Sequence, residues 1–420
     1  MRKLKVIGLH NRVIQMAYIE VKENSEIIVP DNPTIGYIEG DGIGPDISKA
    51  TISVINSALE FSYEGSRSIV WEKVFAGEEA FEKTGKHLPQ ESLDQIRKCV
   101  VAIKGPLTTP IGQGFRSLNV ALRQYFDLYA NVRPVKYFPG VPSPVKAPEK
   151  MNMVVFRENT EDVYAGIEWK HDSLEAAEVR NFLSSKLGVK LTDDTGIGLK
   201  PISRFRSSRL VRKAIQYAIK NNRRSVTLVH KGNIMKYTEG AFKDWGYEVA
   251  SSEFSEETVT EEDYMKDPEL YSGKIIVKDR IADNMFQQIL TRTDDYDIIA
   301  TTNLNGDYLS DAMAAQVGGL GLAPGGNMGD THAIFEAVHG TAPKYAGLDV
   351  ANPTSLMLSG VMMLRHLGWS EAADVTESAI MEAYSDQKVT QDLARVLNIK
   401  ALKCSEFAEE VIKRMKSPKQ

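Results

Sequence analysis

The feature that most constrains the fold is the alternation of short apolar runs with amphipathic segments of helical periodicity. Buried strands separated by helices predict an α/β chain with a largely parallel sheet in each layer. The expected strands lie at residues 34–40, 100–106, 151–159, 225–233 and 296–306. The expected helices lie at residues 45–60, 91–97, 208–220 and 371–384.

Length and charge exclude several classes of protein. A chain of 420 residues is long enough for two or three domains, at roughly 150 residues per domain. The net charge of −5 gives no overall basic field for nucleic acid. Charged residues interrupt the N-terminal segment, so neither a signal peptide nor a membrane span is expected. Two cysteines cannot form a disulfide framework, which fits a reducing, cytoplasmic setting.

Two acids follow the last expected strand. The stretch NLNGDYLSD places Asp307 and Asp311 four residues apart, so a helix would stack both carboxylates on one face, where like charges repel. Either water solvates them or a cation sits between them. For such a pair taken alone, solvation is the better interpretation.

Arginines gather in the middle of the chain. Guanidinium groups suit bidentate capture of carboxylates, so several of them near strand ends favour a polycarboxylate ligand. Any single one of them would more often be a surface or salt-bridged residue. The cluster comprises Arg116, Arg123, Arg133 and Arg157, with Ser117 and Asn119 between the first two on a helix expected to begin near Ser117.

Other candidate residues are weaker signals. The turn EGDGIGPD follows a strand but is not G-x-G-x-x-G, so it predicts a tight turn at least as well as a dinucleotide site. Lys231 and Tyr164 each follow a buried strand, and desolvation there could make Lys231 a proton acceptor. Asp283 is expected on a helix, where a surface or capping role is the ordinary one.

Several ordered blocks of sequence identify a family. From about residue 33 to the C-terminal LKCSEFAEEVI, the chain closely resembles NADP-dependent isocitrate dehydrogenases of the bacterial and archaeal type. These enzymes belong with isopropylmalate and homoisocitrate dehydrogenases. The matching blocks are EGDGIGPD, KGPLTTP, RSLNVALRQ, SPVK, FRENTEDVYAGIEW, LVHKGNIMKYTEGAFKDWGY, NLNGDYLSDA and HGTAPKYAG.

The resemblance implies a substrate and metal site. Arg123, Arg133 and Arg157 would bind the carboxylates of isocitrate, and Ser117 and Asn119 would contact the carboxylate that distinguishes it from related substrates. The substrate would chelate Mg²⁺ or Mn²⁺, hard ions that suit oxygen ligands. The metal ligands would be Asp307, Asp311 and, from the other subunit, Asp283.

The resemblance also implies the chemistry. Lys231 of the neighbouring subunit would take the hydroxyl proton, NADP would accept the hydride, and Tyr164 would protonate the enolate left after CO₂ is lost. The residues expected to bind the cofactor are Leu107, Thr108, Thr109, His339, Gly340, Thr341, Lys344, Tyr345, Asn352, Gln391, Arg395 and, from the partner subunit, Arg292. Close bacterial members have tyrosine at the position of Gln391 and valine at that of Ala351, so some use of NAD is expected.

The implied architecture is an α/β fold of the isocitrate/isopropylmalate dehydrogenase type rather than a Rossmann fold. Residues 1–127 and 322–420 would form a large domain, residues 128–160 and 206–321 a small domain, and residues 161–205 a clasp exchanged in a homodimer with shared active sites. No nucleic-acid or membrane partner is expected. The alternatives are a homoisocitrate or isopropylmalate dehydrogenase, or a non-catalytic regulatory subunit. Isopropylmalate is disfavoured because its enzymes carry apolar residues where Ser117 and Asn119 stand.

Overall fold

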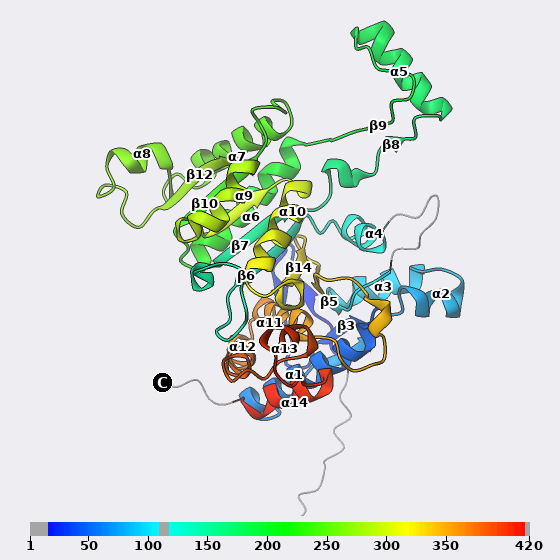
Figure 1. Ribbon diagram of the computed structural model, residues 1–420, viewed down its shortest axis with the longest axis vertical. Coiled ribbons are helices and arrows are strands. Elements are labelled where there is room, and N and C mark those ends of the chain that lie inside the picture. Colours follow the sequence, from blue (N-terminus) through cyan, green and yellow to red (C-terminus); the bar gives the residue numbers. More distant parts are fainter. Residues whose placement is uncertain (1–15, 109–116, 416–420) are drawn as a thin grey trace, which may run out of the picture.

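A single mixed sheet of 11 strands organises the chain (Figure 1). The structure, a computed structural model, describes residues 16–108 and 117–415. In spatial order the strands are β11 (Thr258–Thr260), β12 (Ile275–Ile281), β10 (Ser225–His230), β13 (Ile298–Thr301), β7 (Asn152–Glu158), β6 (Ala130–Lys136), β14 (Pro324–Met328), β15 (Ala333–Ala337), β5 (Val101–Lys104), β3 (Thr34–Ile38) and β4 (Val70–Lys73).

The sheet is parallel at both ends and antiparallel in the middle. The pairs β7–β6, β6–β14 and β14–β15 are antiparallel, and the remaining neighbours are parallel. The prediction of a largely parallel sheet in each layer is therefore confirmed for the two ends and wrong for the centre. Strand β14 has the sequence PGGNM, which carries no strand preference, so its pairing with β6 and β15 comes from tertiary packing.

The expected helices are present, each extended by one or more residues: α1 (Gly44–Tyr63), α3 (Gln90–Cys99), α6 (Arg204–Lys220) and α12 (Ser370–Ser385). Helix α6 begins earlier than expected because the Ser203 hydroxyl caps it by accepting a hydrogen bond from the backbone N–H of Arg206. The other helices are α2 (Glu78–Thr84), α4 (Leu118–Tyr125), α5 (Leu174–Leu187), α7 (Glu239–Glu253), α8 (Glu261–Lys266), α9 (Ala282–Thr291), α10 (Asn303–Gln316), α11 (Thr354–His366), α13 (Gln391–Leu397) and α14 (Cys404–Lys413).

The apolar core is divided along the sheet. One core joins α1, α11, α12 and α14 to strands β3, β5 and β15. In the other half, α6 and α7 cover one face of the sheet, while α9 and α10 cover the opposite face. Side chains of a strand alternate between faces, and the neighbours Val154 and Val155 of β7 accordingly lie in different cores.

Most of the segment between Asp162, which is buried, and the start of α6 leaves the body of the molecule as an arm. Two short strands, β8 (Glu168–Trp169) and β9 (Ile197–Gly198), pair antiparallel, and α5 extends beyond them (Figure 1). Leu174, Phe182 and Leu187 of α5 are 82%, 56% and 60% exposed. The arm lies within the stretch expected to form the clasp, while the exchange of a clasp between subunits and the domain boundaries stay predictions.

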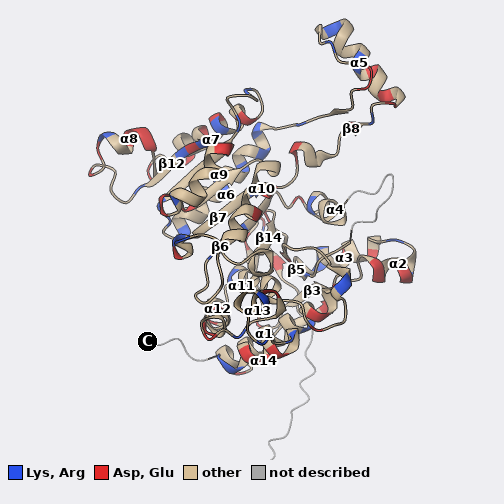
Figure 2. Cartoon of the chain, in the orientation of Figure 1, with Lys and Arg blue, Asp and Glu red and all other residues tan. Residues whose placement is uncertain are grey.

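Charge is mixed over the whole chain. Figure 2 shows lysine and arginine interspersed with aspartate and glutamate on the body and on the arm alike. None of the helices in the described ranges combines the length and the apolar character needed to cross a membrane.

Candidate active site

Asp307 and Asp311 lie on α10, which follows the buried strand β13 directly. The strand expected at residues 296–306 was too long, because β13 ends at Thr301 and α10 begins at Asn303. The Tyr164 hydroxyl and the Arg157 guanidinium each donate a hydrogen bond to Asp307, to different carboxylate oxygens. Arg133 donates to Asp311 at 3.1 Å and lies 3.6 Å from Asp307. The pair of acids is thus surrounded by cations and one phenol rather than by solvent alone.

The two carboxylates have opposite pKa shifts. Burial alone would raise the pKa of Asp307, but Arg157, the Tyr164 hydrogen bond and Arg133 together hold it below its usual value. Burial raises the pKa of Asp311 more than Arg133 lowers it, and the charge of Asp307 adds to the increase. Burial and the hydrogen bond to Asp307 raise the pKa of Tyr164, so this phenol keeps its proton at neutral pH.

The two arginines that bind these acids come from adjacent strands. Arg133 lies on β6 opposite Val155 of β7, and Arg157 lies on β7, so both point to the face of the sheet that α10 covers. Arg157 is only 1% exposed. Gly306 makes room for it, because a Cβ there would lie 2.6 Å from Arg157 Cγ.

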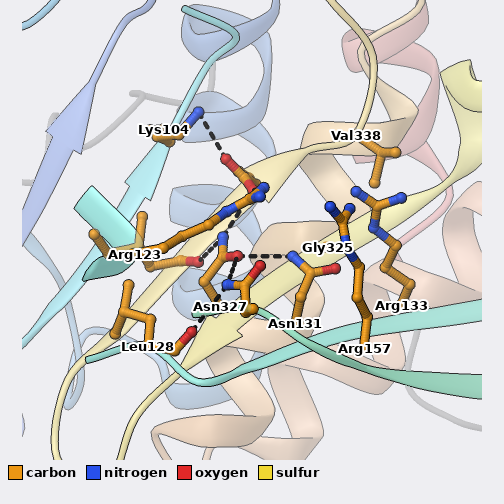
Figure 3. A network of polar contacts seen from close by, with 12 residues as sticks. Lys104, Arg123, Leu128, Asn131, Arg133, Arg157, Gly325, Asn327 and Val338 are labelled. Carbon is orange, nitrogen blue, oxygen red and sulfur yellow. Dashed lines mark hydrogen bonds and ion pairs between the residues drawn. The ribbon is translucent and has the colours of Figure 1, made fainter. Parts of the chain in front are cut away.

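Arg123 lies in a buried network that sequence reasoning missed (Figure 3). Its guanidinium donates to Glu336 at 2.9 Å, and Lys104 binds the other oxygen of Glu336 at 2.8 Å. Asn327 donates to Glu336 at 2.7 Å. Despite burial, Lys104 and Arg123 hold the pKa of Glu336 far below its usual range. In the sequence, this network could have been inferred from Glu336, an acid inside the apolar run AIFEA.

Several polar atoms of the predicted substrate residues are buried and have no partner. These atoms are Nε of Arg123, Nε of Arg133 and Oδ1 of Asn119. Ser117 is the N-cap residue of α4, which carries Asn119 and Arg123, so the expected helix start is confirmed. Buried polar groups without partners are rare in native proteins, and at this place they indicate a polar ligand.

Lys231 and Asp283 form a second, separate group. The Lys231 ammonium binds the Asp283 carboxylate, at the end of β10 and the start of α9. The carboxylate of Glu239, which is fully buried, accepts the backbone N–H of Lys231 at 2.9 Å. Within the described ranges of this single chain, no hydrogen bond or ion pair joins these two residues to Asp307 or Asp311. Their supply by a partner subunit stays a prediction.

The glycine-rich turn supports the loop expected to bind the cofactor. Gly42 has φ +61°, and a Cβ there would lie 2.1 Å from the backbone oxygen of Thr341. The same oxygen accepts the N–H of Ile43 at 2.9 Å. Asp41, which sequence reasoning also missed, accepts the N–H of Thr108 at 2.7 Å. Of the two interpretations of this turn, the structure favours the tight turn.

Loop 339–345 and the neighbouring segment bring several predicted cofactor residues together. Thr108 and Thr341 are joined by a hydrogen bond of 3.4 Å between their hydroxyls, and Leu107 is buried beside them. The Lys344 ammonium lies 4.7 Å from the centre of the Tyr345 ring. His339 Nδ1 lies 3.0 Å from the carbonyl oxygen of Gly340, while its Nε2 is buried without a partner. Thr109 lies outside the described residues.

The remaining predicted cofactor residues lie on two different parts of the fold. Asn352 donates to Asp392 at 3.0 Å, next to the start of α13. Gln391 and Arg395 stand four residues apart on the exposed side of α13, one turn from each other. Arg292 caps the C-terminus of α9, the helix of Asp283, and no hydrogen bond or ion pair in the described ranges joins it to loop 339–345.

A family model described as isocitrate/isopropylmalate dehydrogenase matches residues 34–411. The chain belongs to the isocitrate/isopropylmalate dehydrogenase family. The predicted fold class is thereby confirmed.

Relatives within this family match nearly the whole chain. The isocitrate dehydrogenase (NADP) of Archaeoglobus fulgidus is 56% identical over 400 residues, covering 94% of this chain and 96% of the relative. The isocitrate dehydrogenase (NADP) of Pseudomonas aeruginosa is 56% identical over 404 residues, covering 94% and 97%. The crystal structure of isocitrate dehydrogenase from Methylococcus capsulatus superposes with a TM-score of 0.75 at 38% identity, covering 91% of this chain and 99% of that chain.

The residues of α10 fit a divalent cation. Two partly desolvated carboxylates on one helix face, with the charge of Asp307 raising the pKa of Asp311, are the hard oxygen donors that Mg²⁺ or Mn²⁺ prefers. Within the described ranges of one chain, no group of three His, Cys, Asp or Glu residues is placed to hold a metal. A third carboxylate such as that of Asp283 would have to come from a second chain.

Proposed function

We propose that this chain catalyses the oxidative decarboxylation of isocitrate to 2-oxoglutarate and CO₂, with NADP as the oxidant. The observation that carries the proposal is the assembly of Arg133, Arg157 and Tyr164 around Asp307 and Asp311. The relatives from Archaeoglobus fulgidus and Pseudomonas aeruginosa, both named isocitrate dehydrogenase (NADP), support the same reaction.

Substrate binding changes the ion pairs within this group. Without substrate, the charges of Arg133 and Arg157 are balanced by Asp311 and Asp307. A tricarboxylate gives the arginines new anionic partners, which frees both aspartates to bind a cation. Because isolated buried charges are costly, the cationic and anionic ligands are expected to bind cooperatively.

The residues of the chain then have distinct roles. Lys231 of the partner subunit accepts the proton of the substrate hydroxyl at C2, directly or through water. Tyr164, whose raised pKa keeps it protonated, donates a proton to C3 after CO₂ has left. When bound, NADP supplies the hydride acceptor, and Mg²⁺ or Mn²⁺ supplies a Lewis acid for the charge on the C2 oxygen.

Cofactor choice rests on cations near loop 339–345. Lys344, Tyr345 and Arg395, with Arg292 of the partner subunit, would contact the 2′-phosphate of NADP. Charge-assisted hydrogen bonds contribute roughly 1.5–3 kcal/mol against about 1 kcal/mol for a neutral one. These donors therefore outweigh the phenol that Gln391 replaces, and we infer a preference for NADP with measurable use of NAD.

The active unit in this proposal is a homodimer with a clasp formed by residues 161–205. Support comes from the arm and its exposed apolar side chains, Leu174, Phe182 and Leu187, which a partner would cover. The two buried cysteines, Cys99 and Cys404, are both free thiols, which supports a cytoplasmic setting.

A panel of substrates tests the reaction. Isocitrate, homoisocitrate and isopropylmalate are each offered with NADP and Mg²⁺, and NADPH formation and CO₂ release are measured. Isocitrate should give the highest kcat/KM, because the Ser117 hydroxyl and the side-chain amide N–H of Asn119 can donate hydrogen bonds to a third carboxylate. A higher kcat/KM for either of the other acids would overturn the proposal.

A further inference from the structure

A second cavity lies behind the active-site strands. Its volume is about 790 Å³, within the range of about 300–1,000 Å³ typical of small-molecule sites. Strands β6 and β7 form its floor with Val132, Val154 and Phe156. Because strand side chains alternate between faces, these residues point away from their neighbours Arg133 and Arg157, whose positions on the strands are seen in Figure 3.

The cavity exists because two helices on this face stand apart. Helix α6 packs with the strands of one half of the sheet and α11 with those of the other half. Met328 and Met362 contact both cores and lie in the gap between them. Leu358 and Val361 of α11 complete an apolar wall.

The opposite wall is basic. Lys213, Tyr217 and Lys220 recur at helical spacing on one side of α6, and Arg223 follows the helix. Tyr217 packs its ring against that of Phe156, with centroids 5.3 Å apart. The wall therefore presents cations beside apolar surface.

These cations lack carboxylate partners. In the described ranges, Lys213 donates to the carbonyl oxygen of Gly329 at 2.6 Å, and Arg223 donates to the carbonyl and amide oxygens of Asn152 at 3.1 Å. No ion pair in those ranges includes Lys213, Lys220 or Arg223. Burial lowers the pKa of Lys213 to about 8, although the charge of Asp330 acts in the opposite direction.

The other charges lining the cavity compensate each other. Glu377 binds Lys136 at 3.1 Å and Arg365 at 2.5 Å, and Asp374 binds Arg365 at 2.8 Å. His366 is neutral, because burial lowers its pKa to about 4. The uncompensated charge is therefore positive and lies on the α6 wall.

We propose that this rear cavity binds a small amphipathic anion, with its apolar body over Phe156, Met328 and Met362 and its anionic group at the α6 wall. The anionic group would be bound by charge complementarity, because Lys213, Lys220 and Arg223 form no ion pair with a carboxylate in the described ranges. The apolar floor of the cavity would bind an aromatic or aliphatic part of the ligand. The site is separate from the substrate group, which occupies the opposite face of the same strands.

Calorimetric titration of the full-length protein tests this site. The probe is naphthalene-1-acetate, and its matched neutral control is naphthalene-1-acetamide, which has the same body without the charge. The acid should bind with saturation at one site per chain, and the amide about tenfold more weakly. Saturating isocitrate with Mg²⁺ should leave the binding of the acid unchanged.

Three variants locate the binding. Lys220→Glu should weaken the acid about tenfold by reversing a wall charge, and Met362→Trp should weaken it at least as much by filling the cavity. Lys86→Glu makes the same charge change on an exposed loop outside the cavity and should have no effect. Isocitrate turnover should be unchanged in all three variants.

Several outcomes would overturn the proposal. One is the absence of saturable binding at millimolar acid. Another is equal affinity in wild type, Lys220→Glu and Met362→Trp. Displacement by isocitrate would place the acid at the substrate arginines instead. None of these results bears on whether isocitrate is the substrate, so the two proposals fail independently.

Discussion

At the scale of single residues, the charged side chains of the site form ion pairs with one another. Asp307 binds Arg157, Asp283 binds Lys231, and Glu336 binds both Lys104 and Arg123. Removing one member of a buried pair leaves the other charge uncompensated, which commonly costs about 3–5 kcal/mol. The pairs formed by Asp307 and Glu336 are therefore sensitive to the loss of one partner, whereas the Lys231–Asp283 pair is largely exposed.

The acid pair of α10 should make catalysis depend on a divalent metal. Asp307→Asn should lower turnover by orders of magnitude, with excess Mg²⁺ restoring activity partly at best, because an amide oxygen is a weaker ligand than a carboxylate. The measurement is kcat as a function of Mg²⁺ concentration, with the exposed-site variant Asp374→Asn as control. Full activity of Asp307→Asn in EDTA would contradict the assignment.

Cofactor preference should reverse with two substitutions in loop 339–345. The double variant Lys344→Asp/Tyr345→Ile removes a cation and a phenol from the expected phosphate site and adds a repelling acid. Its kcat/KM should become higher with NAD than with NADP, mostly through weaker binding of NADP. If wild type already prefers NAD, then Gln391 and Ala351 determine the preference more strongly than these cations do.

His366 should make the fold sensitive to acid. Its folded-state pKa of about 4 lies below the ordinary value of 6.5, so the unfolded chain binds the proton more tightly. The stability contribution of neutral His366 is thus present above pH 6.5 and is lost as pH falls from there toward 4. Urea unfolding at pH 7.5 and 5.5 should show a difference smaller by about 1 kcal/mol in His366→Gln than in wild type. An unchanged difference would show that His366 does not titrate in this way.

At the scale of elements, some features could be predicted from local pattern. The run YDIIATT followed by an acid pair at helical spacing predicted β13 and α10, and the cap position of Ser117 predicted α4. The strands β6, β14 and β15 were not predicted. Proline interrupts β6 and two glycines interrupt β14, so pairing across the sheet, rather than local preference, determines these strands.

The candidate site, like the strands and helices, could be predicted only in part from the sequence. Residue types and spacing indicated an anion-binding arginine cluster and a possible cation site, while the roles of Lys231 and Tyr164 came from the family resemblance. Asp41, Glu239 and Glu336 were missed because they bind partners that are distant in sequence, namely Thr108, Thr302 and Arg123. A buried acid signals a partner, but the sequence alone does not say which residue that partner is.

The arm should be required for association. Phe182 is 56% exposed on α5, and an acid there would oppose burial against a partner. Phe182→Asp should raise the dimer dissociation constant at least about tenfold in sedimentation experiments. Phe81→Asp, on α2 and 49% exposed in wild type, is the matched control and should leave association unchanged. Equal dissociation constants for the two variants would show that the arm does not mediate association.

At the scale of the whole molecule, each chain carries two incomplete groups. One comprises Tyr164, Asp307 and Asp311 with the substrate arginines, and the other comprises Lys231 with Asp283. In the proposed homodimer, the first group of one chain would meet the second group of its partner. That sharing was implied by the family resemblance alone, because composition and spacing do not show which chain supplies a residue.

Subunit mixing tests this central claim most directly. Lys231→Met and Tyr164→Phe chains, each inactive alone, are mixed and allowed to exchange. Half of the randomly formed dimers would be mixed, and each mixed dimer would hold one intact site, so about a quarter of wild-type activity should return. As control, the double variant Lys231→Met/Tyr164→Phe mixed with wild type should form mixed dimers without activity, because both of their sites are defective. No recovery after verified exchange of the single variants would contradict the account and show that each site is built from one chain.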